Sequence, residues 1–193
     1  NPTNPYAAAK AGGEMLVNAF GNTYGLPVLT TNTMNLIGER QHSEKMVPKT
    51  IRSILLGETL EIHSDASLTR PGSRFYLHCR NAAAAVLFLL GQDHPPRERY
   101  NIVGEREVNN LTLALTIADI VGLPLRYNLV NWHTSSRPGH DLRYALDGSK
   151  LSSLGFVFPK TFEESLEATI RWTLANPSWL NLPSDTVSRR PSG

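Results

Sequence analysis

The chain has 193 residues, of which 40% are hydrophobic and 19% are charged, and its formal net charge at pH 7 is only +2. This is the composition of an ordinary globular domain, and so small a charge gives no reason to expect nucleic acid or an anionic membrane as a partner. No apolar run approaches the roughly 20 residues needed to span a bilayer, no signal peptide is recognisable, and the single cysteine, Cys79, excludes an intramolecular disulfide. We therefore expect a cytoplasmic protein.

The first half of the chain alternates helical and strand patterns. Asn4 can cap a helix with Pro5 at its first position, and that helix should end near Tyr24, before Gly25. The patterns that follow predict a buried strand, an amphipathic helix and two short strands over residues 28–34, 46–56, 60–63 and 74–78.

The second half continues the alternation. Its patterns predict a helix, a strand, a helix and a strand over residues 82–90, 100–103, 111–121 and 125–130. Asp147 can cap a short helix before Gly155, and Thr161 with Glu164 forms a capping box ahead of a last helix through Leu174. Because helices and strands interleave, the expected fold class is α/β. Residues 181–193 are rich in Ser, Pro and Arg and are expected to form a disordered tail.

Tyr6 and Lys10 stand four residues apart, so on a helix their side chains share one face. A nearby ammonium favours a phenolate over a phenol, and a phenolate can take a proton from a sugar hydroxyl while hydride leaves the same carbon. A tyrosine beside a lysine is also a common feature of helix surfaces, and the spacing alone leaves both interpretations open. Ala11, Gly12 and Gly13 follow, and such small residues permit the close approach of a ligand or another backbone.

A series of motifs runs from Asn4 to about Trp179. They include Asn4-Pro5-Tyr6-Ala-Ala-Ala-Lys10, Thr31-Asn32-Thr33-Met34-Asn35-Leu36-Ile37-Gly38, Tyr100-Asn101-Ile102 and, most specific of all, Arg137-Pro138-Gly139-His140-Asp141. In their order and spacing the motifs resemble the extended short-chain dehydrogenase/reductases, which are NAD-dependent sugar epimerases and dehydratases, and most of all the dTDP-glucose 4,6-dehydratases.

The resemblance implies the end of a Rossmann-type parallel sheet joined to the smaller α/β domain that binds the substrate. Residues 1–40 would be the last helix and strand of a dinucleotide-binding domain, and residues 41–180 would bind the nucleotide sugar. The implied cofactor is NAD, and the implied ligand is a UDP- or TDP-hexose. The helix that carries Tyr6 and Lys10 would pack across the two-fold axis of a homodimer.

Carried over position by position, the resemblance also implies roles for single residues. Tyr6 would be the catalytic base and Lys10 its electrostatic support, and both would contact the cofactor together with Leu36. The residues implied at the nucleotide sugar are Asn35, Lys45, Met46, Glu61, Ile62, His63, Arg74, Asn101, Arg137, His140 and Asp141. The guanidinium forks of Arg74 and Arg137 suit a diphosphate, although an arginine without such a motif is more often a solvated surface charge.

Some positions depart from the dehydratase pattern. Residues 61–63 read Glu-Ile-His where Pro-Ile-Tyr is usual, which leaves the identity of the base open. Phe75 follows Arg74 where the family has an aspartate, Leu36 replaces a second asparagine, and Asn81 stands for an aspartate.

The sequence contains no Gly-rich dinucleotide motif of the form G-x-G-x-x-G or G-x-x-G-x-x-G. The Ser/Thr that joins the tyrosine and lysine, and the Asp-Glu pair that drives dehydration, lie upstream in the family. Because helix-start signals also occupy the first residues, we expect a fragment of an NAD-dependent enzyme that is inactive alone. The alternatives are a non-catalytic nucleotide-sugar-binding or dimerisation module and an unrelated α/β protein. The DNA upstream of Asn1 distinguishes the enzyme fragment from the binding or dimerisation module.

Six histidines and one cysteine raise the question of a metal site. They contain no His-x-x-x-His or Cys-x-x-Cys spacing, so no metal site is expected. His78 and Cys79 are adjacent, and as neighbours in a strand they would face opposite ways. Cys79 is therefore interpreted as a small buried side chain.

Overall fold

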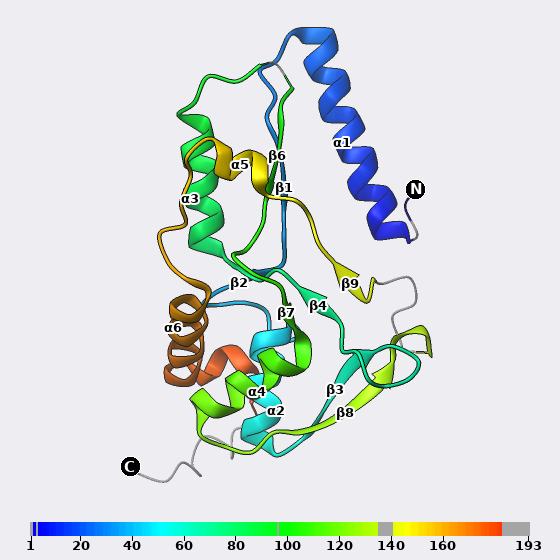
Figure 1. Cartoon of the computed structure of the whole chain (residues 1–193), viewed down its shortest axis with the longest axis vertical. Coiled ribbons are helices and arrows are strands. Elements are labelled where there is room, and N and C mark those ends of the chain that lie inside the picture. Colours follow the sequence, from blue (N-terminus) through cyan, green and yellow to red (C-terminus); the bar gives the residue numbers. More distant parts are fainter. Residues whose placement is uncertain (1, 3, 96, 135–140, 183–193) are drawn as a thin grey trace.

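The computed structural model describes residues 2, 4–95, 97–134 and 141–182, and it confirms the α/β class (Figure 1). Its helices are α1 (Pro5–Tyr24), α2 (Met46–Leu56), α3 (Cys79–Leu90), α4 (Asn110–Val121), α5 (Ser149–Ser153), α6 (Phe162–Ala175) and the 3-10 turns η1 (Trp132–Thr134) and η2 (Pro177–Leu180). Its strands are β1 (Thr30–Thr33), β2 (Leu36–Ile37), β3 (Thr59–Ser64), β4 (Ser73–Arg74), β5 (Leu77–His78), β6 (Arg99–Ile102), β7 (Val108–Asn109), β8 (Arg126–Asn131) and β9 (Arg143–Tyr144).

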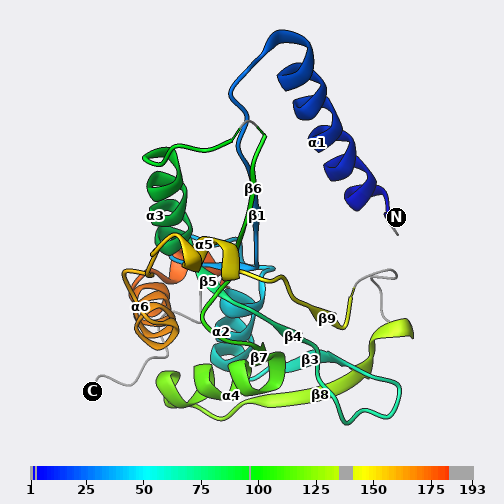
Figure 2. The same ribbon diagram turned by 45° about the horizontal axis from the view of Figure 1, so that its top comes forward.

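The helix α1 begins and ends where local capping chemistry predicts. The Asn4 side chain accepts a hydrogen bond from the Ala7 amide at 2.9 Å, and Gly25 ends the helix with a φ of 67°. None of its 20 residues is buried in the part of the chain that the structure describes. Figures 1 and 2 show α1 standing apart from the rest, and the Glu14–Arg99 ion pair ties it to β6.

The strands β1 and β6 form a parallel pair in which Asn32 lies opposite Asn101. The helices α3 and α5 cover this pair on the side away from α1 (Figure 1). The core between them consists of Leu77, Ala82, Ala85, Leu89, Tyr100, Ile102 and Leu151. Among the described residues β1 has no strand partner other than β6, so its second edge carries unpaired backbone groups.

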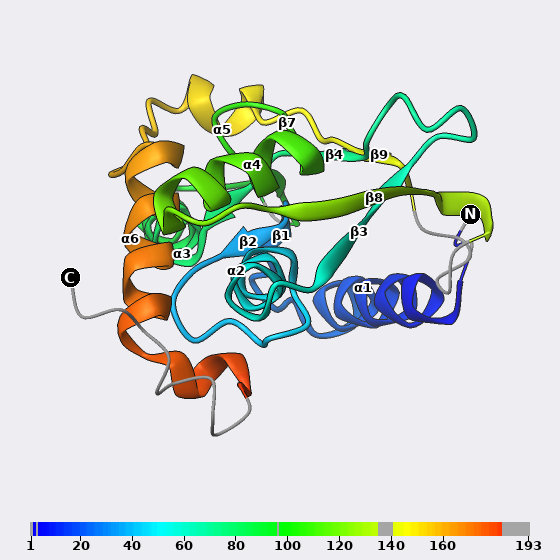
Figure 3. The same ribbon diagram turned by 90° about the horizontal axis from the view of Figure 1, so that it is seen from below.

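The remainder of the chain packs α2, α4 and α6 around a larger core, in which Ile51, Leu113 and Ile170 are fully buried. The parallel pair β3–β8 runs along one side of α4, as seen from below in Figure 3. The strand β4 lies between β7, which is antiparallel to it, and β9, which is parallel. In Figure 1 this three-stranded sheet lies below the lower end of α1.

The single strand predicted over residues 74–78 is wrong. The first part, β4, pairs with β7 and β9, whereas the last part, β5, pairs with β2. Between them the Tyr76 side chain turns into the core, where its hydroxyl donates to Asn110 Oδ1 at 2.7 Å. Burial raises the pKa of Tyr76 to about 12. Burial of the Tyr76 hydroxyl costs little free energy because the hydroxyl has a hydrogen-bond partner. The inward turn of Tyr76 interrupts the alternation of side chains that a single strand over residues 74–78 requires.

The helix α3 starts earlier than predicted, at Cys79. His78 is its N-cap, and the ring nitrogen Nδ1 accepts the Arg80 amide at 3.1 Å. Cys79 is exposed, so its interpretation as a buried side chain is wrong. Cys79 and His78 are also not neighbours in a strand, because the strand ends between them.

Two further expectations concern the ends of elements and the tail. Asp147 accepts from the Ser149 amide at 2.9 Å, although Gly148 is the N-cap of α5. The predicted tail falls, from residue 183 on, outside the described residues. The boundary at residue 40 between the dinucleotide-binding and substrate-binding parts stays a prediction.

No helix in the described ranges has both the length and the apolar character that crossing a bilayer requires.

Candidate active-site cleft

A cleft of about 1120 Å³ lies between α1, β1 and the start of β9. Five residues that the sequence singles out line it together: Tyr6, Lys10, Asn35, Arg74 and Asp141. They come from four separate segments of the chain, so the fold brings together what the sequence keeps as far as 135 positions apart. A cleft that gathers a phenol, two cations and amide groups has the chemistry of a ligand site.

The helix α1 contributes Tyr6 and Lys10 to one wall. Because they are four residues apart, both side chains point to the same face of the helix. The Tyr6 side chain is 76% exposed, which leaves its hydroxyl accessible to a ligand. A phenolate that shares a cleft with an ammonium group can accept the proton of a bound hydroxyl.

Arg74 forms part of the opposite wall, and its guanidinium group organises the chain around it. Nη1 donates to the carbonyls of Ser73 at 2.6 Å and Leu142 at 2.8 Å, and Nη2 donates to the carbonyl of Asp141 at 2.6 Å. Partial burial lowers the pKa of Arg74 from its ordinary value, although Tyr76, Asp141 and Tyr144 oppose the effect. Among the described residues Arg74 makes these three hydrogen bonds, which leave two of the five guanidinium hydrogens for a ligand.

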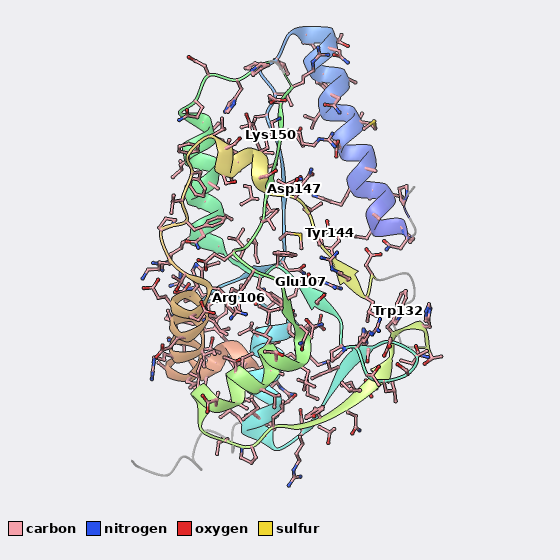
Figure 4. The ribbon with its side chains drawn as sticks, viewed as in Figure 1. Arg106, Glu107, Trp132, Tyr144, Asp147 and Lys150 are labelled. Carbon is pink, nitrogen blue, oxygen red and sulfur yellow. The ribbon has the colours of Figure 1, made fainter. Side chains whose placement is uncertain are left out.

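Glu107 holds β9 against β4 beside this wall. Its carboxylate accepts two hydrogen bonds from Arg143, both at 2.8 Å, and one from the Ser73 hydroxyl. These bonds keep the pKa of Glu107 below its ordinary value. Figure 4 labels Glu107 near the middle of the molecule and Tyr144 of β9 above it. Tyr144 lines the cleft as well, and the sequence reasoning did not select it.

Asn32 lines the cleft, whereas Asn101 is not among the residues that line it. The Asn32 amide donates to Asn101 Oδ1 at 3.1 Å, and the Asn101 amide donates to the Asp147 carbonyl at 2.8 Å. Asn32 is therefore a second residue that the sequence reasoning missed. Only the register of β1 against β6 reveals it, and that register depends on residues 69 positions apart.

Residues 1–103 of this chain match the model of the NAD dependent epimerase/dehydratase family. The chain belongs to this family. The resemblance seen in the motifs is thereby confirmed.

The names of individual relatives agree with this family assignment. The trifunctional UDP-glucose 4,6-dehydratase/UDP-4-keto-6-deoxy-D-glucose 3,5-epimerase/UDP-4-keto-L-rhamnose-reductase of Arabidopsis thaliana is 39% identical over 178 residues, 92% of this chain and 26% of that protein. The dTDP-glucose 4,6-dehydratase of Shigella flexneri is 37% identical over 191 residues, 96% of this chain and 52% of that protein. The chain thus spans about half or less of the length of these relatives.

A solved structure supports the fold. The dTDP-glucose 4,6-dehydratase of Streptomyces venezuelae, crystallised with NAD bound, matches with a TM-score of 0.79 and 33% identity over 93% of this chain and 53% of that one. The parallel pairs of this chain accordingly belong to a Rossmann-type fold of the epimerase/dehydratase family.

The remaining predicted site residues that the structure describes do not line the cleft. Leu36 lies in β2 and is 42% exposed, while Lys45 is the N-cap of α2 and Met46 its first residue. On β3, Glu61 is exposed, His63 is half-buried and Ile62 is buried in the core at 2% exposure, so only the backbone of Ile62 can reach a ligand. The assignment of Leu36 to the cofactor and of the other five residues to the nucleotide sugar stays a prediction. Arg137 and His140 lie outside the described residues.

Proposed function

We propose that this chain is the C-terminal, nucleotide-sugar-binding part of an NAD-dependent nucleotide-sugar 4,6-dehydratase, and that the chain alone is inactive. The observation that carries the proposal is the cleft in which Tyr6 and Lys10 of α1 meet Arg74 and Asn35. The names of the relatives, a dTDP-glucose 4,6-dehydratase and a trifunctional enzyme that includes a UDP-glucose 4,6-dehydratase, support the reaction class.

In the proposed reaction Tyr6 is the base. Its phenolate accepts the proton of the C4 hydroxyl as the C4 hydride departs, and the carbon becomes a ketone. NAD supplies the hydride acceptor when it is bound. Lys10 stabilises the phenolate by its charge, and the free donors of Arg74 take oxygens of the diphosphate.

The residues present fit only one end of NAD. The Tyr6 hydroxyl and the Lys10 ammonium are donors suited to the nicotinamide ribose. The pyrophosphate needs a Gly-rich turn at the N-terminus of a helix, and this sequence has no such motif. The strand β1 lines the cleft beside them, and its second edge, which has no partner among the described strands, can accept the strands of a preceding dinucleotide-binding half.

Calorimetric titration with NAD tests whether NAD binding requires the sequence upstream of Asn1. We expect no binding at micromolar NAD for the 193-residue chain. A longer protein that includes the sequence encoded in frame upstream of Asn1 should bind in that range. Micromolar binding by the short chain would refute the proposed boundary. A start codon close to Asn1 would favour the alternative, a binding or dimerisation module.

We also propose that α1 packs against its copy in a homodimer. Met15, Leu16 and Phe20 are 59%, 63% and 52% exposed on this helix, and an apolar face of this kind is costly in water. Light scattering at low concentration measures the mass directly. A clean monomer would count against the dimer.

A further inference from the structure

Three side chains with the chemistry of metal ligands meet where β2, β5 and α3 join, and none of them lines the cleft. Glu39 follows β2, His78 ends β5 and Cys79 begins α3. The parallel register places Ile37 opposite His78, so Glu39 arrives beside the imidazole. His78 Nε2 lies 3.3 Å from Glu39 Oε2, and Cys79 Sγ lies 3.9 Å from His78 Nδ1.

The close approach of the thiol depends on Gly38. A Cβ atom at this position would lie 2.7 Å from Cys79 Sγ and 3.4 Å from His78 Nε2, and the φ of +155° is one that other residues rarely adopt. Glycine therefore lets the sulfur sit over the backbone that leads into Glu39. One ligand atom from each of the three side chains falls within a span of 4.8 Å.

We propose that Glu39, His78 and Cys79 form a binding site for a thiophilic divalent cation of the Zn²⁺ class. Thiolate, imidazole and carboxylate are the three ligand types that Zn²⁺ takes in proteins, and sites with three protein ligands keep a fourth position open. His78 is 5% exposed and fixed, whereas Cys79 is exposed, so the open position faces solvent on the Cys79 side.

Cation binding replaces two existing interactions of the Glu39 carboxylate, one with His78 and one with Arg80. The Arg80 amide donates to His78 Nδ1, which puts the ring proton on Nε2, where it faces Glu39. The cation takes the place of that proton and of the Cys79 thiol proton, and both leave to solvent. The Arg80 guanidinium, 3.7 Å from Glu39 Oε1, competes for the carboxylate; its side chain is 76% exposed and is not needed for packing.

Titration of the untagged chain with Co²⁺ tests the site. Cys79 is the only cysteine in the sequence, so a thiolate-to-cobalt charge-transfer band can come from no other residue. We expect a band that saturates at one Co²⁺ per chain and disappears when Zn²⁺ is added. Cys79→Ser, a change at an exposed position, should abolish it.

Two carboxylate variants and one arginine variant sharpen the test. Glu39→Gln should weaken Co²⁺ binding at least tenfold, whereas Glu44→Gln, at an exposed position in the same loop, should not change it. Arg80→Ala should strengthen binding about two- to fivefold, the effect of removing an exposed competing pair. Absence of the band in the unaltered chain, or a band of unchanged affinity in Glu39→Gln, would overturn the proposal.

Discussion

Replacing Tyr6 by phenylalanine should lower kcat of the longer protein by about 10²- to 10⁴-fold, the usual contribution of a general base. The ring that remains fills the same space, so KM for the nucleotide sugar should change little. Stability should stay within about 0.5 kcal/mol, because the side chain is 76% exposed. Steady-state turnover of dTDP-glucose and UDP-glucose measures the first two effects, and urea unfolding measures the third.

Tyr24→Phe is the matched control for this change. Tyr24 lies on the same helix and is 67% exposed, but it does not line the cleft. It should keep full activity. If the Tyr6 variant were as active as the parent, or if both variants lost activity equally, Tyr6 would not be the base.

The second large effect is expected at Gly104. A Cβ atom there would lie 2.1 Å from the carbonyl oxygen of Tyr76, which is backbone and cannot swing aside. Gly104→Ala must therefore push the segment that follows β6 away from the segment between β4 and β5, where Tyr76 enters the core. Overpacking of this kind costs about 1–3 kcal/mol, and we expect the upper end of that range, measured by urea unfolding.

Gly12→Ala serves as its control. Gly12 lies inside α1, and a Cβ atom there would meet nothing within 4 Å. Alanine is favoured over glycine in a helix by up to about 1 kcal/mol, so the change should not lower stability. If Gly104→Ala were equally harmless, the close packing of Gly104 on Tyr76 would not contribute to the fold.

The elements that rest on local chemistry could be predicted from the sequence. Asn4 and Gly25 fix the ends of α1, and Thr161 with Glu164 forms the capping box that starts α6. The division of residues 74–78 between two sheets could not be predicted, because it depends on partners from β2, β7 and β9.

The site follows the same rule. Tyr6 and Lys10 could be paired from their spacing on one helix, but nothing local places Arg74 in the same cleft. Asn32 escaped notice because its role depends on the register with Asn101, and Glu39 because it reaches His78 through the β2–β5 pair. In each case the missing information is a pairing between strands that are distant in the sequence.

The central claim is that the cleft belongs to a nucleotide-sugar dehydratase whose other half lies upstream. The most direct measurement is product analysis after the longer protein and the 193-residue chain are each incubated with NAD and dTDP-glucose or UDP-glucose. We predict a 4-keto-6-deoxy sugar nucleotide from the longer protein and no product from the short chain. Conversion by the short chain, or a longer protein that binds NAD yet leaves both sugars unchanged, would contradict the claim.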